Sequence, residues 1–481
     1  MNYRQQIHDY LAAHRGEMTE LLKSLIRIPS VRGEAEPGAP FGRACNEVLE
    51  FTQRLYDSVG MKTELCCDGG YLLAEMGDGE RSLGLFAHAD VVPVADDWTF
   101  TPPFEPMEKE GCLIGRGVMD DKAAIVTSLF CARMIQELAI PFCSQLVCFT
   151  GANEESGMQD IRSYVNAHTP PDFSLVCDTA FPLYHGNKGR FTFIARSGTP
   201  FEQIKSFSGG VKGGAVMGKA MAVLPFDDAL YDWLTARRSA DMTVCRQCGE
   251  IVITALGLST HLAIPEGSRN AGGMLASLLA ECPMLAENDR RQMAFVAEIL
   301  TKYYGEALGI ACEDEVFGRL TCANSFAETR DGCLFCHFNV RRGNSRTAAE
   351  IADTLKAAFA AEGWQADVTF GTDPHLVPAD DAYVQACLGE YREMTGDMSA
   401  PRVNAGGTYA VYLPRAVEIG PTCGGAPSGM PAGHGRVHQP DECANIDGIL
   451  RAAEITMQML LACDDIHSGG QTRGCWPNSA E

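Results

Sequence analysis

Histidine and carboxylate side chains follow several apolar runs of this sequence: LGLFA, QLVCFTGAN and SLVC. Others follow the turn GRGVM and a Gly- and Pro-rich loop beyond AVEIGP. In chain order they are His88, Asp90, Asp120, Asp121, Glu154, Glu155, Asp178 and His438. Neutral imidazole and carboxylate suit zinc, manganese or cobalt, and a donor set without cysteine is typical of a catalytic site. The pattern therefore predicts a catalytic metal centre.

These donors exceed the needs of one ion, because a catalytic zinc takes about three protein ligands plus water. They suffice for two ions that share a carboxylate, with one acid left over as general base. Such two-metal sites are typical of hydrolases. A lone histidine at a strand end is more often a packed or solvent-facing residue, and an acid pair is usually solvated loop charge. Recurrence at five strand or turn ends favours the metal site, because bound cations relieve the repulsion between clustered carboxylates.

The elements that would position these residues alternate between strands and helices. Up to residue 180, short apolar runs alternate with helical patterns over 123–138 and 159–167, after predicted helices over 3–28 and 41–59. This alternation predicts a largely parallel sheet flanked by helices, whose ligands collect beyond the carboxyl ends of the strands. The α/β pattern resumes with a helix near 381, a strand at AVEIG and a helix over 445–462.

A chain of 481 residues is too long for one ordinary core, so we expect two domains, with three as the alternative. Between 187 and 374, alternating strands surround helices over 271–280 and 347–361, which predicts an α+β domain inserted into the α/β domain. The expected fold class is therefore α/β, with a mixed, largely parallel sheet and an inserted α+β domain. The catalytic domain would comprise 1–186 and 375–465, followed by a polar tail over 466–481.

Composition excludes several classes of partner. The formal charge of −23 repels phosphate backbones, so we expect no nucleic-acid partner. No apolar run approaches the ~18 residues that span a bilayer, and the first residues lack the apolar region of a signal peptide. We therefore expect a cytoplasmic protein without a membrane partner. Twenty cysteines without a secretion signal indicate reduced thiols.

Two C-x-x-C spacings, Cys245 with Cys248 and Cys333 with Cys336, could together form a four-thiolate zinc site. However, Cys333 and Cys336 lie in a predicted strand, where positions three apart face opposite sides. We therefore interpret all four cysteines as small apolar filler.

Four motifs, FAHADVVP with a following Trp, GRGVMDDK, TGANEESG and HQPDE, resemble in order the signatures of the metal-dependent acylase and dipeptidase family. That family includes acetylornithine deacetylase, succinyl-diaminopimelate desuccinylase and carnosinases. LIRIPSV resembles its first helix and turn, so the resemblance spans residues ~20 to ~450. CDTAFP, FNVRR, GGTYA and the long insert are most similar to the bacterial PepV-type dipeptidases. In that branch the insert is a lid over the site, and the enzyme is usually a monomer that removes one N-terminal residue from short peptides.

The resemblance implies a role for each site residue. Asp120 would bridge two divalent ions, most simply zinc, with manganese or cobalt as alternatives. His88 and Asp178 would complete one ion, and Glu155 and His438 the other. Glu154 would be the general base, Asp90 would orient His88, and the Asp120–Asp121 peptide would be cis. In the insert, His261 would polarise the scissile carbonyl. Arg341 would bind the terminal carboxylate of a small peptide substrate, assisted by the amides of Gly406, Gly407 and Thr408.

Two departures from the family pattern stand out. Ala222 in AMAVLPF matches a lid asparagine that helps to bind the oxyanion, and Asp441 replaces the commoner asparagine of HQPDE. We expect a dipeptidase that acts on substrates with a free C-terminal carboxylate. The alternatives are an N-acyl-amino-acid deacylase of the same family and a catalytically silent peptide- or metal-binding relative. A dimer is the alternative to the expected monomer.

Overall fold

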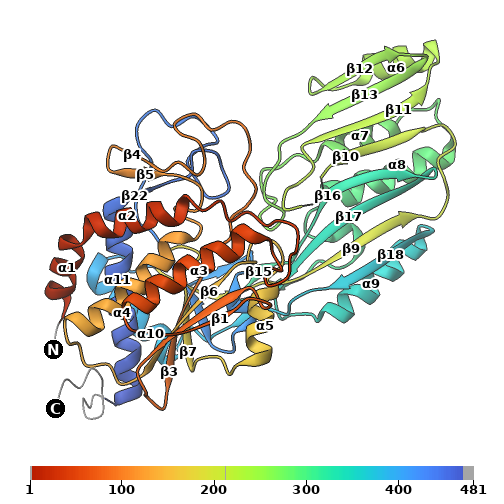
Figure 1. The fold of residues 1–481 in the computed structure, drawn as a ribbon. Coiled ribbons are helices and arrows are strands. Elements are labelled where there is room, and N and C mark those ends of the chain that lie inside the picture. Colours follow the sequence, from red (N-terminus) through yellow and green to blue (C-terminus); the bar gives the residue numbers. More distant parts are fainter. Residues whose placement is uncertain (1–2, 212, 470–481) are drawn as a thin grey trace. The chain divides into compact units, whose positions relative to one another are not determined.

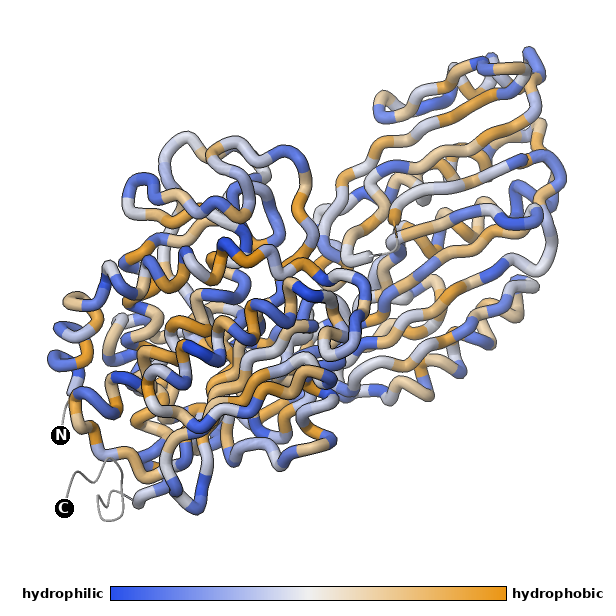
Figure 2. Tube along the Cα trace, in the orientation of Figure 1, coloured by the Kyte–Doolittle hydropathy of each residue, from blue (hydrophilic) through white to orange (hydrophobic). Residues whose placement is uncertain are grey.

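The computed structural model describes residues 3–211 and 213–469. The chain divides into two compact units: unit 1 comprises Met1–Gly186 and Leu376–Glu481, and unit 2 comprises Asn187–His375. Apolar residues line the strands of both (Figure 2), and each unit has a large hydrophobic core of its own. Of the tail predicted over 466–481, residues up to Ser468 belong to the last helix, and residues 470–481 lie outside the described part.

The described residues of unit 1 form a nine-stranded sheet in the order β1-β2-β6-β3-β7-β21-β8-β19, with β20 beside β8 (Figure 1). Its centre is parallel, because β3 runs parallel to β6 and β7, and β7 runs parallel to β21. The strands are β1 Lys62–Cys66, β2 Tyr71–Met76, β3 Ser82–His88, β6 Gln145–Gly151, β7 Phe173–Val176, β8 Tyr184–Asn187, β19 His375–Leu376, β20 Arg402–Asn404 and β21 Ala416–Glu418. The predicted largely parallel arrangement is confirmed for the central strands, whereas β1 and β2 pair antiparallel.

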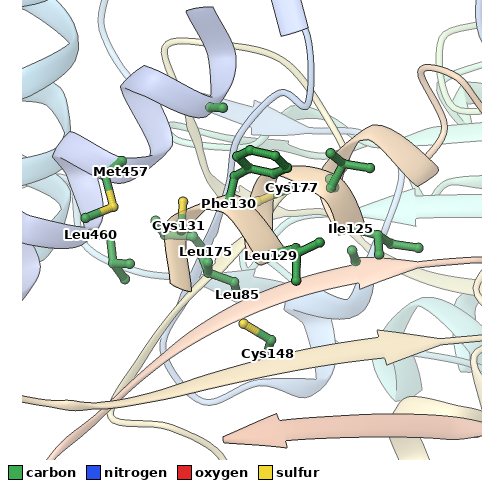
Figure 3. Packing of buried hydrophobic residues seen from close by; sticks show 14 of the residues in the cluster. Leu85, Ile125, Leu129, Phe130, Cys131, Cys148, Leu175, Cys177, Met457 and Leu460 are labelled. Atoms are coloured by element: carbon green, nitrogen blue, oxygen red, sulfur yellow. The ribbon is translucent and has the colours of Figure 1, made fainter. Parts of the chain in front are cut away.

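Helices cover the sheet of unit 1, and α4 lies in its core between the strands and α11 (Figure 3). Cys131 of α4 lies near Leu175 of the sheet and near Met457 and Leu460 of α11. The helices are α1 Arg4–Ala13, α2 Arg15–Ile26, α3 Arg43–Ser58, α4 Lys122–Glu137, α5 Gln159–Ala167, α10 Ala382–Thr395 and α11 Ile446–Ser468, with the short 3-10 helix η2 Tyr409–Tyr412. A separate small sheet has the order β22-β5-β4, with β4 Met107–Lys109, β5 Cys112–Ile114 and β22 Cys443–Asn445.

The helix predicted over residues 3–28 is two helices, α1 and α2, that meet at His14. The His14 ring stacks on Tyr10 at 4.1 Å between centroids, and its Nδ1 lies 2.8 Å from the Tyr10 carbonyl oxygen. These side-chain contacts hold the bend, which the apolar periodicity alone could not reveal.

Unit 2 is an α+β unit whose sheet has the order β12-β13-β11-β10-β16-β17-β9-β18, with neighbouring strands antiparallel. The strands are β9 Gly189–Ser197, β10 Ser206–Gly210, β11 Lys219–Pro225, β12 Met242–Gln247, β13 Glu250–Leu256, β16 Thr321–Arg330, β17 Cys333–Arg342 and β18 Trp364–Phe370, beside the short pair β14 Glu313–Asp314 and β15 Gly318–Arg319. The helices are α6 Asp228–Arg237, α7 Ala271–Ala280, α8 Glu287–Thr301, η1 Glu306–Leu308 and α9 Ala348–Ala361. The helices predicted over 271–280 and 347–361 are confirmed as α7 and α9.

None of the helices in the described ranges has both the length and the apolar character needed to cross a bilayer.

Candidate metal centre

Three neighbouring parallel strands of unit 1 end at the same edge of the sheet, and each is followed by candidate ligands. In the strand register His88 stands opposite Gly151, three residues before Glu154. On the other side of β3, Phe86 stands opposite Val176, two residues before Asp178. The carboxyl ends of parallel strands thus bring together side chains that are distant in sequence.

One group of ligand atoms gathers around His88. Its Nε2 lies 2.9 Å from Asp120 Oδ1 and 3.6 Å from Asp178 Oδ1. Its Nδ1 lies 2.9 Å from the backbone oxygen of Asp90. Because that carbonyl can only accept, Nδ1 donates to it, so Nε2 is the ring atom that faces the carboxylates; a proton pairs it with Asp120, and a metal ion would take the place of that proton.

A second group gathers around His438, on the opposite side of Asp120. Its Nε2 lies 2.9 Å from Asp120 Oδ2 and 3.0 Å from Glu155 Oε1. Asp120 therefore directs one carboxylate oxygen to each histidine, as a bridging ligand does. The Asp120–Asp121 peptide is cis, as the family resemblance implied.

The chemistry of these donors fits divalent cations. Ligand atoms of His88, Asp120 and Glu155, and likewise of His88, Glu154 and Asp178, lie within 4.8 Å of one another. Burial and the negative charge of Asp178 raise the pKa of Glu154 well above its usual range, and burial and Asp120 raise the pKa of Glu155 to about 7. Bound cations stabilise such crowded carboxylates, because they offset the repulsion between the negative charges.

The same negative environment favours the positively charged form of the imidazoles. Hydrogen bonds with Asp120 and Glu155 raise the pKa of His438 to about 10. Burial alone would raise the pKa of Asp120, but the hydrogen bonds from His438 and His88 outweigh burial, so the pKa of Asp120 is lowered. The protons that pair these groups are those that divalent ions would replace.

Asp90 does more than orient His88. Its carboxylate is buried and accepts hydrogen bonds from the backbone amides of Glu154 and Glu155, at 3.1 and 3.2 Å. The backbone carbonyl oxygen of Asp90 lies 2.9 Å from His88 Nδ1, and its carboxylate Oδ1 lies 3.5 Å from the same nitrogen. Asp90 therefore joins the ligand at the end of β3 to the loop that carries both glutamates.

The segment that follows α2 packs under the same strand end. Lys122 is fully buried, and its ammonium group donates to the carbonyl oxygens of Leu25 and Ile28, at 2.9 and 2.8 Å. Burial lowers the pKa of Lys122 to about 7. Ser30 Oγ donates to the Ala89 carbonyl at 2.6 Å. The LIRIPSV motif thus fixes the backbone on both sides of the ligands.

Glu442 is a positioning residue that the sequence reasoning missed. It is fully buried, and it accepts hydrogen bonds from the amides of Met119 and Asp120 at 2.8 and 3.2 Å. Arg116 Nη1 donates to its other oxygen at 2.6 Å. Because a buried carboxylate paired with a buried guanidinium holds its geometry, Glu442 fixes the turn that presents Asp120.

Asp441, the departure from the family asparagine, is structural. Its buried carboxylate accepts from the amides of Thr99 and Phe100, both at 3.0 Å, and lies 2.7 Å from His434 Nδ1. These bonds tie the loop that carries His438 to the segment after the His88 motif.

The predicted substrate loop at Gly406–Thr408 also belongs to unit 1, with one correction. The amide of Gly406 donates to Asn404 Oδ1 at 2.8 Å, so it is not available to a substrate as predicted. The amides of Gly407 and Thr408 have no acceptor among residues 3–211 and 213–469. Asn404 and Thr408 both donate from their side chains to the buried Glu418, which fixes the loop.

His261 and Arg341 both lie in unit 2. The amide of Ala263 donates to His261 Nδ1 at 3.2 Å, so the ring proton lies on Nε2, which can donate. Arg341 is 7% exposed, and its Nε donates to Asn339 Oδ1 at 2.8 Å. Its Nη1 is buried with no hydrogen-bond partner in the described chain. Burial and the neighbouring Arg190 lower the pKa of Arg341 to about 10.

The match of Ala222 to the oxyanion asparagine is wrong. Ala222 lies on β11 between Phe207 and Ile253, with its side chain fully buried in the core of unit 2. The segment beside His261 lies earlier: Ala215 forms a β-bridge with His261, and a β-carbon at Gly214 would stand 3.5 Å from its Nε2. Neither residue of this segment has a donor side chain.

The two C-x-x-C pairs cannot share an ion within one chain. Cys333 and Cys336 are buried on β17, as expected of filler, whereas Cys245 and Cys248 are exposed, so the filler interpretation is wrong for that pair. Five strand spacings separate β12 from β17, or about 24 Å at ~4.8 Å each.

Residues 84–462 match a family model that is described as "Peptidase family M20/M25/M40". Curated relatives include "Putative dipeptidase YtjP" of Bacillus subtilis, which is 28% identical over 459 residues and covers 91% of this chain and 95% of its own. A "Putative dipeptidase" of Staphylococcus epidermidis is 25% identical over 472 residues and covers 93% of this chain and 97% of its own.

Solved structures share the fold over nearly the whole chain. Human carnosine dipeptidase 1 aligns with a TM-score of 0.59 at 14% identity, covering 97% of this chain and 99% of its own. The dipeptidase Dug1p of Saccharomyces cerevisiae aligns with a TM-score of 0.56 at 12% identity, with the same coverage.

Proposed function

This chain belongs to peptidase family M20/M25/M40, and we propose that it is a dipeptidase that requires two divalent metal ions and acts on substrates with a free C-terminal carboxylate. The observation that carries the proposal is Asp120, whose two oxygens face His88 and His438 at 2.9 Å each. The names of the curated relatives support the same assignment.

Five residues would hold the ions: His88, Asp120 and Asp178 on one side, and His438, Glu155 and the shared Asp120 on the other. We propose zinc, with manganese and cobalt as alternatives that the same donors accommodate. When bound, the ions would lower the pKa of the attacking water and polarise the scissile carbonyl. A monomeric state and a cytoplasmic location stay predictions.

Glu154 would move the proton during hydrolysis. Its carboxylate lies within 4.8 Å of ligand atoms of His88 and Asp178, a position from which it could accept a proton from water and then give it to the leaving amine. The bond from its amide to Asp90 fixes the backbone from which its side chain extends. Asp90 would therefore act through the loop rather than touch the substrate.

The inserted unit would contribute the groups that bind the scissile carbonyl and the terminal carboxylate of the peptide. His261 would donate from Nε2 to the developing oxyanion, an interaction worth about 3 kcal/mol in comparable sites. The unpartnered Nη1 of Arg341 suits the terminal carboxylate of the substrate, because a guanidinium can bind both carboxylate oxygens. In this proposal the insert acts as a lid.

The proposal is tested with metal-free protein reloaded with zinc, manganese or cobalt at equal occupancy. We expect hydrolysis of Ala-Leu and Ala-Ala, little hydrolysis of N-acetyl-alanine, and loss of all activity on chelation. Turnover of N-acetyl amino acids alone would make the protein the alternative deacylase. Activity that survives complete chelation would refute the metal mechanism, and a loaded protein that hydrolyses neither substrate would be the silent relative.

A further inference from the structure

The hairpin of β12 and β13 carries the sequence Cys-Arg-Gln-Cys-Gly at its tip. Gln247 pairs with Glu250, which leaves Cys248 and Gly249 as a two-residue turn. Both have positive φ, 48° and 79°, a conformation that hairpin turns usually reserve for Asn, Asp or Gly. A cysteine at this position is therefore unusual.

The exposure of this pair sets it apart from the other thiols. Cys245 and Cys248 are exposed, whereas every other free cysteine in the described ranges is buried or half-buried. Core packing explains a buried cysteine, but it cannot explain two exposed ones at this spacing. Two exposed thiols separated by two residues indicate a chemical role, because C-x-x-C is the usual spacing of thiolate ligands in structural zinc sites.

Neighbouring residues fix the backbone of the hairpin tip, and the space beside Gly249 is open. The amide of Phe226 donates to the Gly249 carbonyl at 3.2 Å, and the Arg246 guanidinium lies 3.8 Å from the centroid of the Phe226 ring. Lys205 and Glu250 form an ion pair at 2.7 Å. A β-carbon at Gly249 would meet no atom within 4 Å. The backbone between the two thiols is thus positioned in advance, with free space around it.

We propose that Cys245 and Cys248 bind a zinc ion as one half of a four-thiolate site, and that a second copy of this chain supplies the other half. Each thiol loses its proton to the solvent as its sulfur binds the ion. A structural zinc needs four ligands, and no cluster of three or more potential ligands within residues 3–211 and 213–469 includes these cysteines. The site is therefore incomplete in one chain.

The position of the hairpin at the edge of the sheet allows a second copy of the chain to approach the two thiols. Among the described residues β12 is the edge strand of the unit 2 sheet, and none of them forms a strand on the outer side of the tip (Figure 1). Two copies related by a twofold axis would each present the same two thiols to one ion, which closes the assembly as a dimer. Without zinc the chain would be a monomer.

The test uses reduced, full-length protein that is first freed of metal and then titrated with cobalt, because zinc added first would fill the proposed thiolate site. Thiolate ligands give cobalt an intense near-ultraviolet charge-transfer band, whereas a site of imidazole and carboxylate gives none. We expect a band whose final intensity matches one four-thiolate cobalt per two chains, with a doubling of the mass in light scattering. Cys245→Ser and Cys248→Ser should each abolish both signals and keep the peptidase activity, and the control Cys312→Ser should keep all three.

Three results would overturn the proposal: no charge-transfer band, a band that persists when both cysteines are replaced, or a band whose intensity matches one cobalt per chain with unchanged mass. Because the readouts are spectroscopic and hydrodynamic, they do not depend on whether the proposed dipeptidase activity is found.

Discussion

The carboxylate of Asp90 accepts a hydrogen bond from the backbone amide of Glu154, with Oδ1 and N 3.1 Å apart. The same residue faces Nδ1 of His88 through its carbonyl oxygen. One buried residue, Asp90, therefore positions both a proposed metal ligand and the proposed general base, although 64 residues of sequence separate Asp90 from Glu154.

The first prediction concerns that link. Asp90→Asn keeps the shape of the side chain but replaces one acceptor oxygen with a donor, which cannot accept from the amide of Glu154 or Glu155. We expect kcat/KM of the metal-loaded enzyme to fall about 10- to 100-fold, the usual effect of removing a group that orients metal ligands. Asp96→Asn, an exposed carboxylate of the following loop, is the matched control. Equal activity of the two variants would show that Asp90 has no positioning role.

The second prediction separates two adjacent glutamates. Glu154→Gln removes the proposed base, so kcat should fall about 10²- to 10⁴-fold while the affinity for zinc is little changed. Glu155→Gln removes a proposed ligand, so the affinity for the second ion should fall first, and excess metal should restore part of the activity. Calorimetric zinc titrations alongside steady-state kinetics measure both effects. The reverse pattern would exchange the assigned roles.

The third prediction concerns recognition of the substrate carboxylate. Arg341→Lys keeps the charge but loses the two-pronged geometry, so KM for Ala-Leu should rise about 10-fold or more. The matched control is the same dipeptide with an amidated C-terminus, whose KM should be alike in the variant and in the unmodified enzyme. If KM for both substrates rises equally, Arg341 supports the fold rather than the carboxylate.

The fourth prediction concerns pH and the end of α11. His467 lies 2.7 Å from both Ser144 Oγ and Tyr383 OH, and burial, with a contribution from Arg81, lowers its pKa to about 4. A depressed pKa means that the unfolded chain binds the proton more readily. The stability from the neutral ring is therefore complete above the ordinary pKa of 6.5 and is lost as the pH falls through about 4.

The measurement is Tm between pH 7.5 and 4.5 for the unmodified protein and for His467→Gln, which retains a donor and an acceptor. The variant should lose less Tm over this range, because it lacks the group that takes up the proton. Parallel curves would show that His467 does not contribute to the acid sensitivity of the fold.

Sequence reasoning brought the candidate ligands together because parallel strands present their carboxyl ends at one edge, so a residue such as Asp178 is marked by its place after an apolar run. It missed the role of Glu442, although the HQPDE motif contains it, and it missed Glu418, because the sequence does not show which carboxylates are buried against backbone amides and side chains. It misplaced the oxyanion position at Ala222, because a short motif does not show which face of a strand a residue occupies. It treated Cys245 as filler for a related reason, since hydropathy does not separate an edge hairpin from a core strand.

The most direct test of the account is anomalous diffraction from crystals of this protein grown with zinc. We predict two peaks in unit 1, one beside His88 and Asp178 and one beside His438 and Glu155, with Asp120 between them and Glu154 bound to neither. A single peak, or two peaks that do not share Asp120, would contradict the two-metal mechanism.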